Sequence, residues 1–259
     1  MIDAIEQIPV TLPSRGRLYK DDRIPDGKVT ISPWTVAQEE VLLSFGESDY
    51  NTLVTQLLEN NVHLPNSMPC GDLLLTDQFF LMVQLRCHSY VPWHTMVHTC
   101  PHCKHEHAVQ IDLGTLEVKV PDDDVPYVEP IDCFLPKRKK TVQLKYLRFG
   151  DEVAAGQYSA KSKTSMRHTT RQYLYARQIV SIDDKSLPWD EKMEFVLTLP
   201  LLDLECIKMR LNERTTGITG RVPTKCPACG KEDDTWAPPL HVNFFRPTKA
   251  DLDRGCVVV

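Results

Sequence analysis

Two pairs of cysteines are the residues most able to do chemistry in this chain. Cys100 and Cys103 form one Cys-Pro-X-Cys motif, and Cys226 and Cys229 form a second. Two intervening residues let both sulfurs of one tight turn reach the same metal at roughly 2.3 Å, and four thiolates complete a tetrahedral zinc site. Because such a set leaves no open position for water, the motifs predict a structural Zn²⁺ ion.

The two motifs are unusually far apart for one zinc site. Between Cys103 and Cys226 lie 122 residues, so a shared ion would close a module over a long insertion. Two separate sites, or four free thiols, are the alternatives. Gly230 follows the second motif and suits the left-handed backbone position that such turns often need.

A thiol oxidoreductase is the competing interpretation of the first motif. A thioredoxin-type cysteine pair begins a helix, whose dipole lowers the pKa of the thiol. The residues after Cys103 instead alternate in polarity, as in a strand. The context therefore favours metal binding over redox catalysis.

Several other candidate residues favour ordinary structural roles. Four histidines could be alternative ligands or a second site, but with four cysteines present we expect them to be exposed or to support the site: His98, His102, His105 and His107. Four further cysteines are expected to act as small core residues: Cys70, Cys87, Cys133 and Cys206. The basic run 137–140 is interpreted as a solvated loop, and Asp183, Asp184, Asp203 and Glu205 as solvated charges.

Composition limits the class of protein. The chain has 259 residues, a net charge of −5 and 42% hydrophobic residues, enough for a substantial core. An acidic balance provides no general attraction for a phosphate backbone, so a nucleic-acid-associated zinc-ribbon regulator remains only an alternative.

No apolar run reaches about 18 residues, and the acidic start is unlike a signal peptide. We expect a cytosolic product, with neither a membrane nor a small-molecule substrate among its partners. The tail 256–259 formally matches a prenylation motif, but valine is atypical at its last position.

The hydrophobic periodicity predicts an α+β fold with a helical N-terminal layer. Helices are expected at 36–45, 51–61 and 72–88, the first begun by a capping box of Thr35 and Gln38 and ended at Gly46. Alternating polarity predicts strands around 96–98, 108–113, 116–120 and 141–149, with a loop over 121–130. Helical spacing returns at 150–163, 166–182, 189–199 and 201–213, and residues 241–245 alternate again.

These patterns divide the chain into six parts. We expect an extended arm (1–33), a helical layer (34–92), the first half of a small antiparallel zinc-ribbon-like module with connecting strands (93–149), a helical insertion (150–214), the second half of that module (215–247) and a C-terminal tail (248–259). An arm rich in proline and glycine is expected to bury little of its own surface and to suit contact with a neighbouring subunit.

Several short segments, in their order along the chain, resemble one known family. They are Leu12–Gly16 with Tyr19, Thr35–Glu40, Thr76–Leu81, the two cysteine motifs, Leu199–Asp203 and Phe244–Pro247. Together they resemble the baseplate hub and hub assembly proteins of contractile-tailed, T-even-like bacteriophages.

The resemblance implies a non-enzymatic role in building the tail baseplate through contacts with other baseplate and hub proteins. A member could be a component of the finished virion tail or an assembly factor in the host cytoplasm. We expect the arm to dock on a partner through Leu12, Pro13, Ser14, Arg15, Gly16 and Tyr19.

Overall fold

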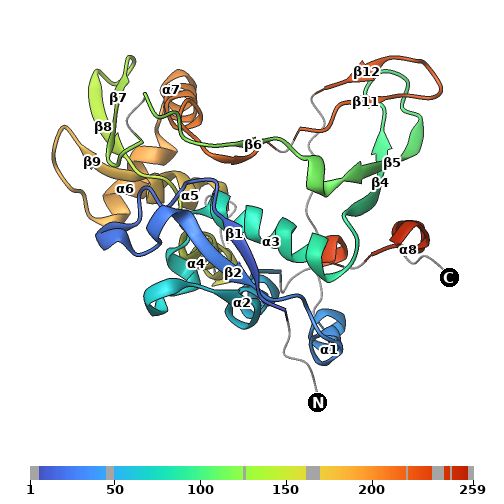
Figure 1. Ribbon diagram of the computed structural model, residues 1–259. Coiled ribbons are helices and arrows are strands. Elements are labelled where there is room, and N and C mark those ends of the chain that lie inside the picture. The colour runs from blue at the N-terminus through green and yellow to red at the C-terminus, as the bar shows by residue number, and fades with distance from the viewer. Residues whose placement is uncertain are drawn as a thin grey trace.

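The computed structural model describes residues 6–44, 50–124, 127–161, 170–219, 221–234, 242–245 and 247–255. It is a mixed α+β protein with antiparallel sheets, as expected. Figure 1 shows helix α3 crossing the middle of the molecule, with two groups of strands at its opposite ends. In the described part, no helix is long and apolar enough to cross a membrane.

The N-terminal segment packs into the body of the protein. Strand β1 (Ile8–Thr11) pairs with β2 (Lys28–Ile31), which pairs with β3 (Val62–His63). The connection contains two 3-10 helices, η1 (Lys20–Asp22) and η2 (Pro25–Gly27). The expectation that this segment buries little of its own surface is wrong, because Leu12 and Ile24 lie in the core.

The helical layer that follows agrees with the sequence prediction. It contains α1 (Val36–Ser44), α2 (Tyr50–Asn61) and α3 (Leu75–Ser89). The Thr35 backbone N–H donates to Gln38 Oε1 at 2.9 Å, as in the expected capping box. Gly46, the expected helix end, lies outside the described residues. Apolar side chains of α2, α3 and the β1–β3 sheet contribute to the first hydrophobic core.

A second core lies at the other end of α3. It joins the sheet β7 (Ile131–Leu135), β8 (Lys140–Leu144) and β9 (Ile179–Ile182) to three helices: α5 (Thr170–Gln178), α6 (Trp189–Leu197) and α7 (Leu201–Asn212). Helix α4 (Phe149–Lys161) contacts α5, but its Phe149 lies in the first core. All four helices were predicted. Two corrections concern strands: 179–182 is a strand rather than the end of a helix, and the strand expected over 141–149 stops at Leu144.

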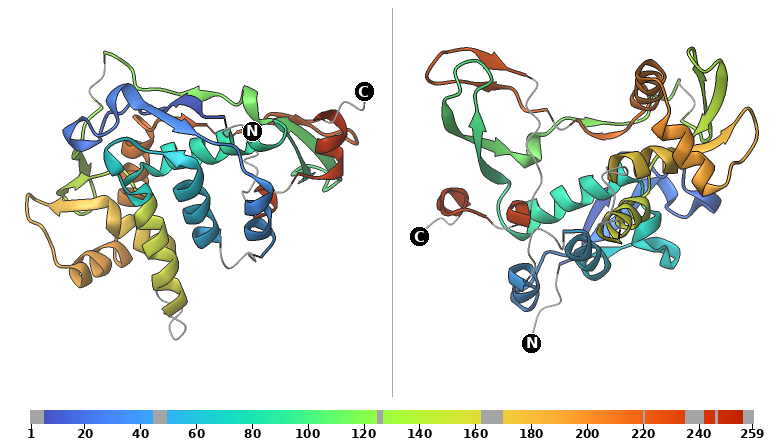
Figure 2. Two further views of the ribbon diagram at one scale, coloured as in Figure 1. Left: turned by 60° about the horizontal axis from the view of Figure 1, so that its bottom comes forward. Right: turned by 180° about the vertical axis from the view of Figure 1, so that it is seen from behind.

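Two hairpins form the end of the molecule that carries the cysteines (Figure 2). Strand β4 (Trp93–Thr99) pairs with β5 (Glu106–Asp112), and β11 (Thr224–Lys225) pairs with β12 (Glu232–Asp233). A ladder of β6 (Val118–Lys119) and β10 (Gly217–Ile218) connects this end to the rest. The strands expected around 96–98, 108–113 and 116–120 are therefore present, each belonging to a two-stranded sheet.

The last described segments return to the first core. Residues Val242–Phe245 form a 3-10 helix, η7, so the strand expected there is wrong; His241 lies outside the described residues. Phe244 and Phe245 are both buried. Helix α8 (Lys249–Gly255) follows and contacts β4. The C-terminal tail expected from residue 248 is therefore helical as far as residue 255. Residues 256–259, with the prenylation-like motif, also lie outside the described part.

Candidate metal centre

The four predicted cysteines come together at the tips of the two hairpins. Cys100 Sγ lies 3.8 Å from Cys229 Sγ, and Cys103 Sγ lies 3.6 Å from Cys226 Sγ. All four sulfurs lie within 4.8 Å of one another. The fold thus joins two motifs that are separated by 122 residues in sequence.

The two turns have the same backbone hydrogen bonds. In the first, the Cys100 N–H donates to His105 O at 3.0 Å and the Lys104 N–H donates to Cys100 O at 2.9 Å. In the second, Cys226 N–H donates to Lys231 O and Gly230 N–H donates to Cys226 O, both at 2.9 Å. Each turn places two thiols on one side of a tight loop, so the two turns present matching halves of one site.

A left-handed residue completes each turn. Lys104 has a φ of 63° and Gly230 a φ of 70°. The expectation for Gly230 is therefore confirmed, and no heavy atom lies within 4 Å of the Cβ position at this glycine.

The donor set fits a tetrahedral metal ion. Regular coordination with Zn–S bonds near 2.3 Å places sulfurs about 3.8 Å apart, close to the two short separations here. Cys100 and Cys226 are 1% and 4% exposed, whereas Cys103 and Cys229 face solvent. Half of the site is thus shielded by protein.

The pKa values of two thiols move in opposite directions. Backbone N–H groups of Cys103 and His102 lower the pKa of Cys100 to about 7. At Cys103 the His105 N–H also lowers the pKa, but partial desolvation by nearby protein atoms and the three neighbouring thiols outweigh it and raise the pKa to about 12. Four adjacent thiolates repel one another, so a cation is needed to hold all four ionised.

The histidines of this segment have other surroundings. His98 is buried, and its Nε2 lies 3.4 Å from Asp233 Oδ2 on the opposite hairpin. The His107 ring packs against His98 at 5.3 Å and His105 at 5.9 Å between ring centroids, and His102 is exposed. Among the described residues, the four cysteines are the group spaced to hold a metal, and none of these histidines joins it.

The location of the first motif does not match a thioredoxin-type site. Cys100 and Cys103 lie between strands β4 and β5, in a hairpin turn rather than at a helix N-terminus. The helix dipole that activates such thiols is absent from this turn.

The residues expected to dock on a partner make contacts within the chain. Leu12, Pro13 and Ser14 are buried. Ser14 Oγ donates to Asp77 Oδ2 at 2.5 Å, and Tyr19 Oη donates to the same oxygen at 2.8 Å. Arg15 is exposed, and partner binding by this segment stays a prediction. The internal role was missed because Asp77 lies 63 residues from Ser14 in sequence.

A buried ionic group near the hairpins was also missed. Arg86 and Asp251 are both 0% exposed, and their charged groups lie 3.9 Å apart. Asp251 also accepts a hydrogen bond from Thr95 Oγ1 at 2.6 Å and lies 4.0 Å from His94 Nδ1. Burial, followed by the nearby Arg86 charge, lowers the pKa of His94. The group fixes α8 to β4.

The remaining candidates give mixed outcomes. Cys133 is buried as expected, whereas Cys70, Cys87 and Cys206 are half-buried. The basic run lies in and after the β7–β8 turn, with most of it exposed, as expected. Asp203 is not a solvated charge: it is 0% exposed and accepts hydrogen bonds from the backbone N–H groups of Lys137 and Arg138, which secures that turn.

Comparison with known proteins supports the resemblance seen in the sequence. No curated protein and no solved structure matches the chain. The family model described as T4 bacteriophage base plate protein matches residues 7–246, a span that contains both cysteine motifs, both cores and the Ser14–Asp77 contact. Since this match covers most of the sequence, the chain belongs to the T4 bacteriophage base plate protein family.

Proposed function

We propose that this protein is a non-enzymatic hub component or hub assembly factor of the phage tail baseplate, in which a structural Zn²⁺ ion is held by Cys100, Cys103, Cys226 and Cys229. The convergence of four sulfurs within 4.8 Å, from two distant hairpins, carries the proposal. Family membership supports the baseplate role.

A structural ion meets a specific need of this fold. The β11–β12 pairing involves only two residues on each strand, and a small isolated hairpin is marginally stable in water. Bonds from both hairpins to one ion would hold β11–β12 against the longer β4–β5 hairpin. The ion would supply this crosslink when bound, and in the first turn the backbone N–H groups of His102, Cys103 and His105 donate to the sulfurs.

Protein contacts are the proposed mode of action. Apolar side chains are exposed at several places distant from the cysteines, including Phe134, Leu201 and Met209. Exposed apolar groups of this kind are common at protein interfaces. Other baseplate and hub proteins are the proposed partners, met in the host cytoplasm during assembly and retained in the virion tail if the protein is a component.

Metal analysis of the purified chain tests the site. We expect about one zinc per chain, lost in Cys226→Ser and retained in Cys206→Ser, whose thiol lies outside the cluster. Chelation should also lower the thermal midpoint, because metal binding and folding are coupled. A metal-free chain with an unchanged midpoint would reject the zinc proposal.

The assembly role needs a separate experiment. Quantitative mass spectrometry of purified tails and of baseplate intermediates should detect the chain in at least one of them. Presence in finished tails indicates a virion component, and presence in intermediates alone indicates an assembly factor. Absence from both contradicts the proposed role.

A further inference from the structure

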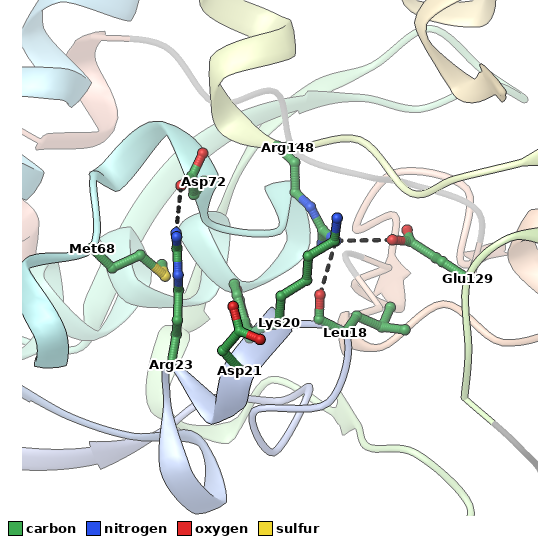
Figure 3. A pocket seen from close by; sticks show the side chains of 9 residues that line it. Leu18, Lys20, Asp21, Arg23, Met68, Asp72, Glu129 and Arg148 are labelled. Atoms are coloured by element: carbon green, nitrogen blue, oxygen red, sulfur yellow. Dashed lines mark hydrogen bonds and ion pairs between the residues drawn. The ribbon is translucent and has the colours of Figure 1, made fainter.

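A cavity of about 410 Å³ opens at the other side of the molecule from the cysteines. Its wall includes η1, the loop before α3 and Arg148, just before α4 (Figure 3). Three basic and three acidic side chains surround it, so the pocket has little net charge. This balance disfavours a polyanion such as nucleic acid and suits a ligand that carries a single charge.

One nitrogen of the Arg148 guanidinium has no hydrogen-bond partner in the described part of this wall. Its Nη2 donates to Leu18 O at 3.0 Å and to Glu129 Oε2 at 2.9 Å. Its guanidinium also lies over the Tyr19 ring, 5.7 Å from the centroid. The Nη1 atom is buried and has no partner among the described residues. A buried donor left unpaired costs about 1–3 kcal/mol, which a bound acceptor would recover.

Lys20 supplies a second unpaired cation on the same cavity. Its side chain is exposed, and no carboxylate of the described residues lies within ion-pair distance of its ammonium group. Arg23 differs, because Asp72 Oδ2 lies 3.1 Å from its Nη1. Arg148 and Lys20 are therefore the donors available to an incoming group.

The backbone of this wall is strained. Leu18 has a φ of 74° and Asp21 a φ of 57°. Both lie in the left-handed region, which residues other than glycine seldom adopt. Such conformations cost about 1–3 kcal/mol and often occur where a ligand binds. Here they turn the chain so that η1 faces Arg148 across the cavity.

We propose that this pocket, named here the Arg148 pocket, binds one aspartate or glutamate carboxylate presented by a neighbouring baseplate protein. Arg148 Nη1 donates to the carboxylate from inside the wall, and the Lys20 ammonium pairs with it from the rim. The inference rests on the proposed assembly role for the source of the carboxylate, but carboxylate binding itself is independent of the metal.

Nuclear magnetic resonance titration with N-acetylglutamate α-methylamide, which carries a single carboxylate, tests the pocket in the zinc-loaded full chain. Saturable shifts are expected for residues 18–23 and 148, with none for the neutral analogue N-acetylglutamine α-methylamide. Lys20→Gln should weaken binding about threefold, as for one exposed charge pair. Lys28→Gln is the matched control, because that exposed lysine pairs with Asp26 outside the pocket.

The outcomes separate this inference from the zinc proposal. Equal shifts with N-acetylglutamine α-methylamide or with sulfate, or equal binding by the two lysine variants, would overturn carboxylate recognition. If the titration shows carboxylate binding, carbodiimide crosslinking of intact baseplate particles is expected to join Lys20 to an acidic residue of another protein. Carboxylate binding in solution without that crosslink would reject the baseplate neighbour as the occupant, while the metal content would be unaffected.

Discussion

Arg86 and Asp251 place opposite charges where neither side chain reaches solvent. The Arg86 guanidinium also donates to three backbone carbonyl oxygens, those of Val91, Trp93 and Phe244. Burial lowers the pKa of Arg86, while the Asp251 charge raises it. Sequence alone shows an arginine within an apolar helix but not the aspartate that neutralises it, since the two lie 165 positions apart.

Replacing Asp251 by asparagine should destabilise the protein by about 3 kcal/mol, because it leaves the Arg86 charge buried without a counterion. Urea unfolding measures this free energy. Asp253→Asn is the control, since that residue is exposed on the same helix, and it should change the free energy by less than about 0.5 kcal/mol. Equal effects of the two variants would contradict the role assigned to Asp251.

Two glycines with similar backbone angles differ in their surroundings. Gly16 has a φ of 76°, and a Cβ there would lie 2.1 Å from Ile24 O. Gly230 has a φ of 70° and open space at the Cβ position.

Gly16→Ala should therefore cost about 3 kcal/mol or more, because a backbone clash adds to the left-handed strain. Gly230→Ala should cost only about 1 kcal/mol, from strain alone. Thermal unfolding of both variants compares them directly. A larger loss for Gly230→Ala would show that the turn at the metal centre constrains its glycine in some other way.

At the scale of elements, the sequence predicted helices well and short strands poorly. The caps and apolar stripes of α1, α2 and α3 are local signals, so their positions could be predicted. Strand β9 could not, because it follows α5 directly and its pairing with β8 depends on residues about 40 positions away. The 3-10 helix η7 has the alternating polarity of a strand, but core packing of its two phenylalanines decides its shape.

The candidate site likewise contains residues that local sequence could predict and residues that depend on distant contacts. Cysteine spacing predicted all four members of the cluster, because a Cys-X-X-Cys turn is itself a local structure. The Asp77, Asp203 and Asp251 contacts could not be predicted, because each buried carboxylate meets partners from distant segments. Aspartates of a folded core and of a solvated surface look alike in sequence.

Asp151 secures the start of α4 and links stability to pH. Its carboxylate accepts hydrogen bonds from the Arg148 backbone N–H, Lys145 and Arg177. Burial raises the pKa of Asp151, but these partners together lower it below the ordinary value of 3.8. A lowered pKa in the folded state means that the contribution to stability is present above about pH 4 and is lost as the pH falls further.

Asp151→Asn should lower the unfolding free energy by about 2 kcal/mol at pH 7, because it removes charge-assisted hydrogen bonds. The difference from the native chain should shrink as the pH falls below about 4. Urea unfolding at several pH values measures it, with Asp190→Asn, an exposed first-turn residue of α6, as the control. A difference that is constant with pH would refute the linkage.

At the scale of the whole molecule, the two hydrophobic cores and the hairpins have different sources of stability. The second core, around β7–β9, contains no residue of the cysteine hairpins. The first core includes Ile111 of β5 and the phenylalanines of η7, so it supports the base of the hairpins. At their tips the two hairpins instead meet through the cysteine cluster and the His98–Asp233 contact.

Removal of the proposed zinc ion should therefore loosen one end of the molecule without unfolding the rest. Hydrogen exchange after chelation should become faster at β11–β12 and at the tips of β4 and β5, because local opening follows the loss of local contacts. Exchange in β7–β9 should stay unchanged, as should exchange at the base of β4, where Thr95 contacts Asp251. Uniformly faster exchange would mean that the ion stabilises the entire fold, and unchanged exchange at the tips would mean that the hairpins hold together without it.

In the expected pattern the zinc ion stabilises the hairpin end alone, so baseplate contacts made by the β7–β9 end should survive its removal.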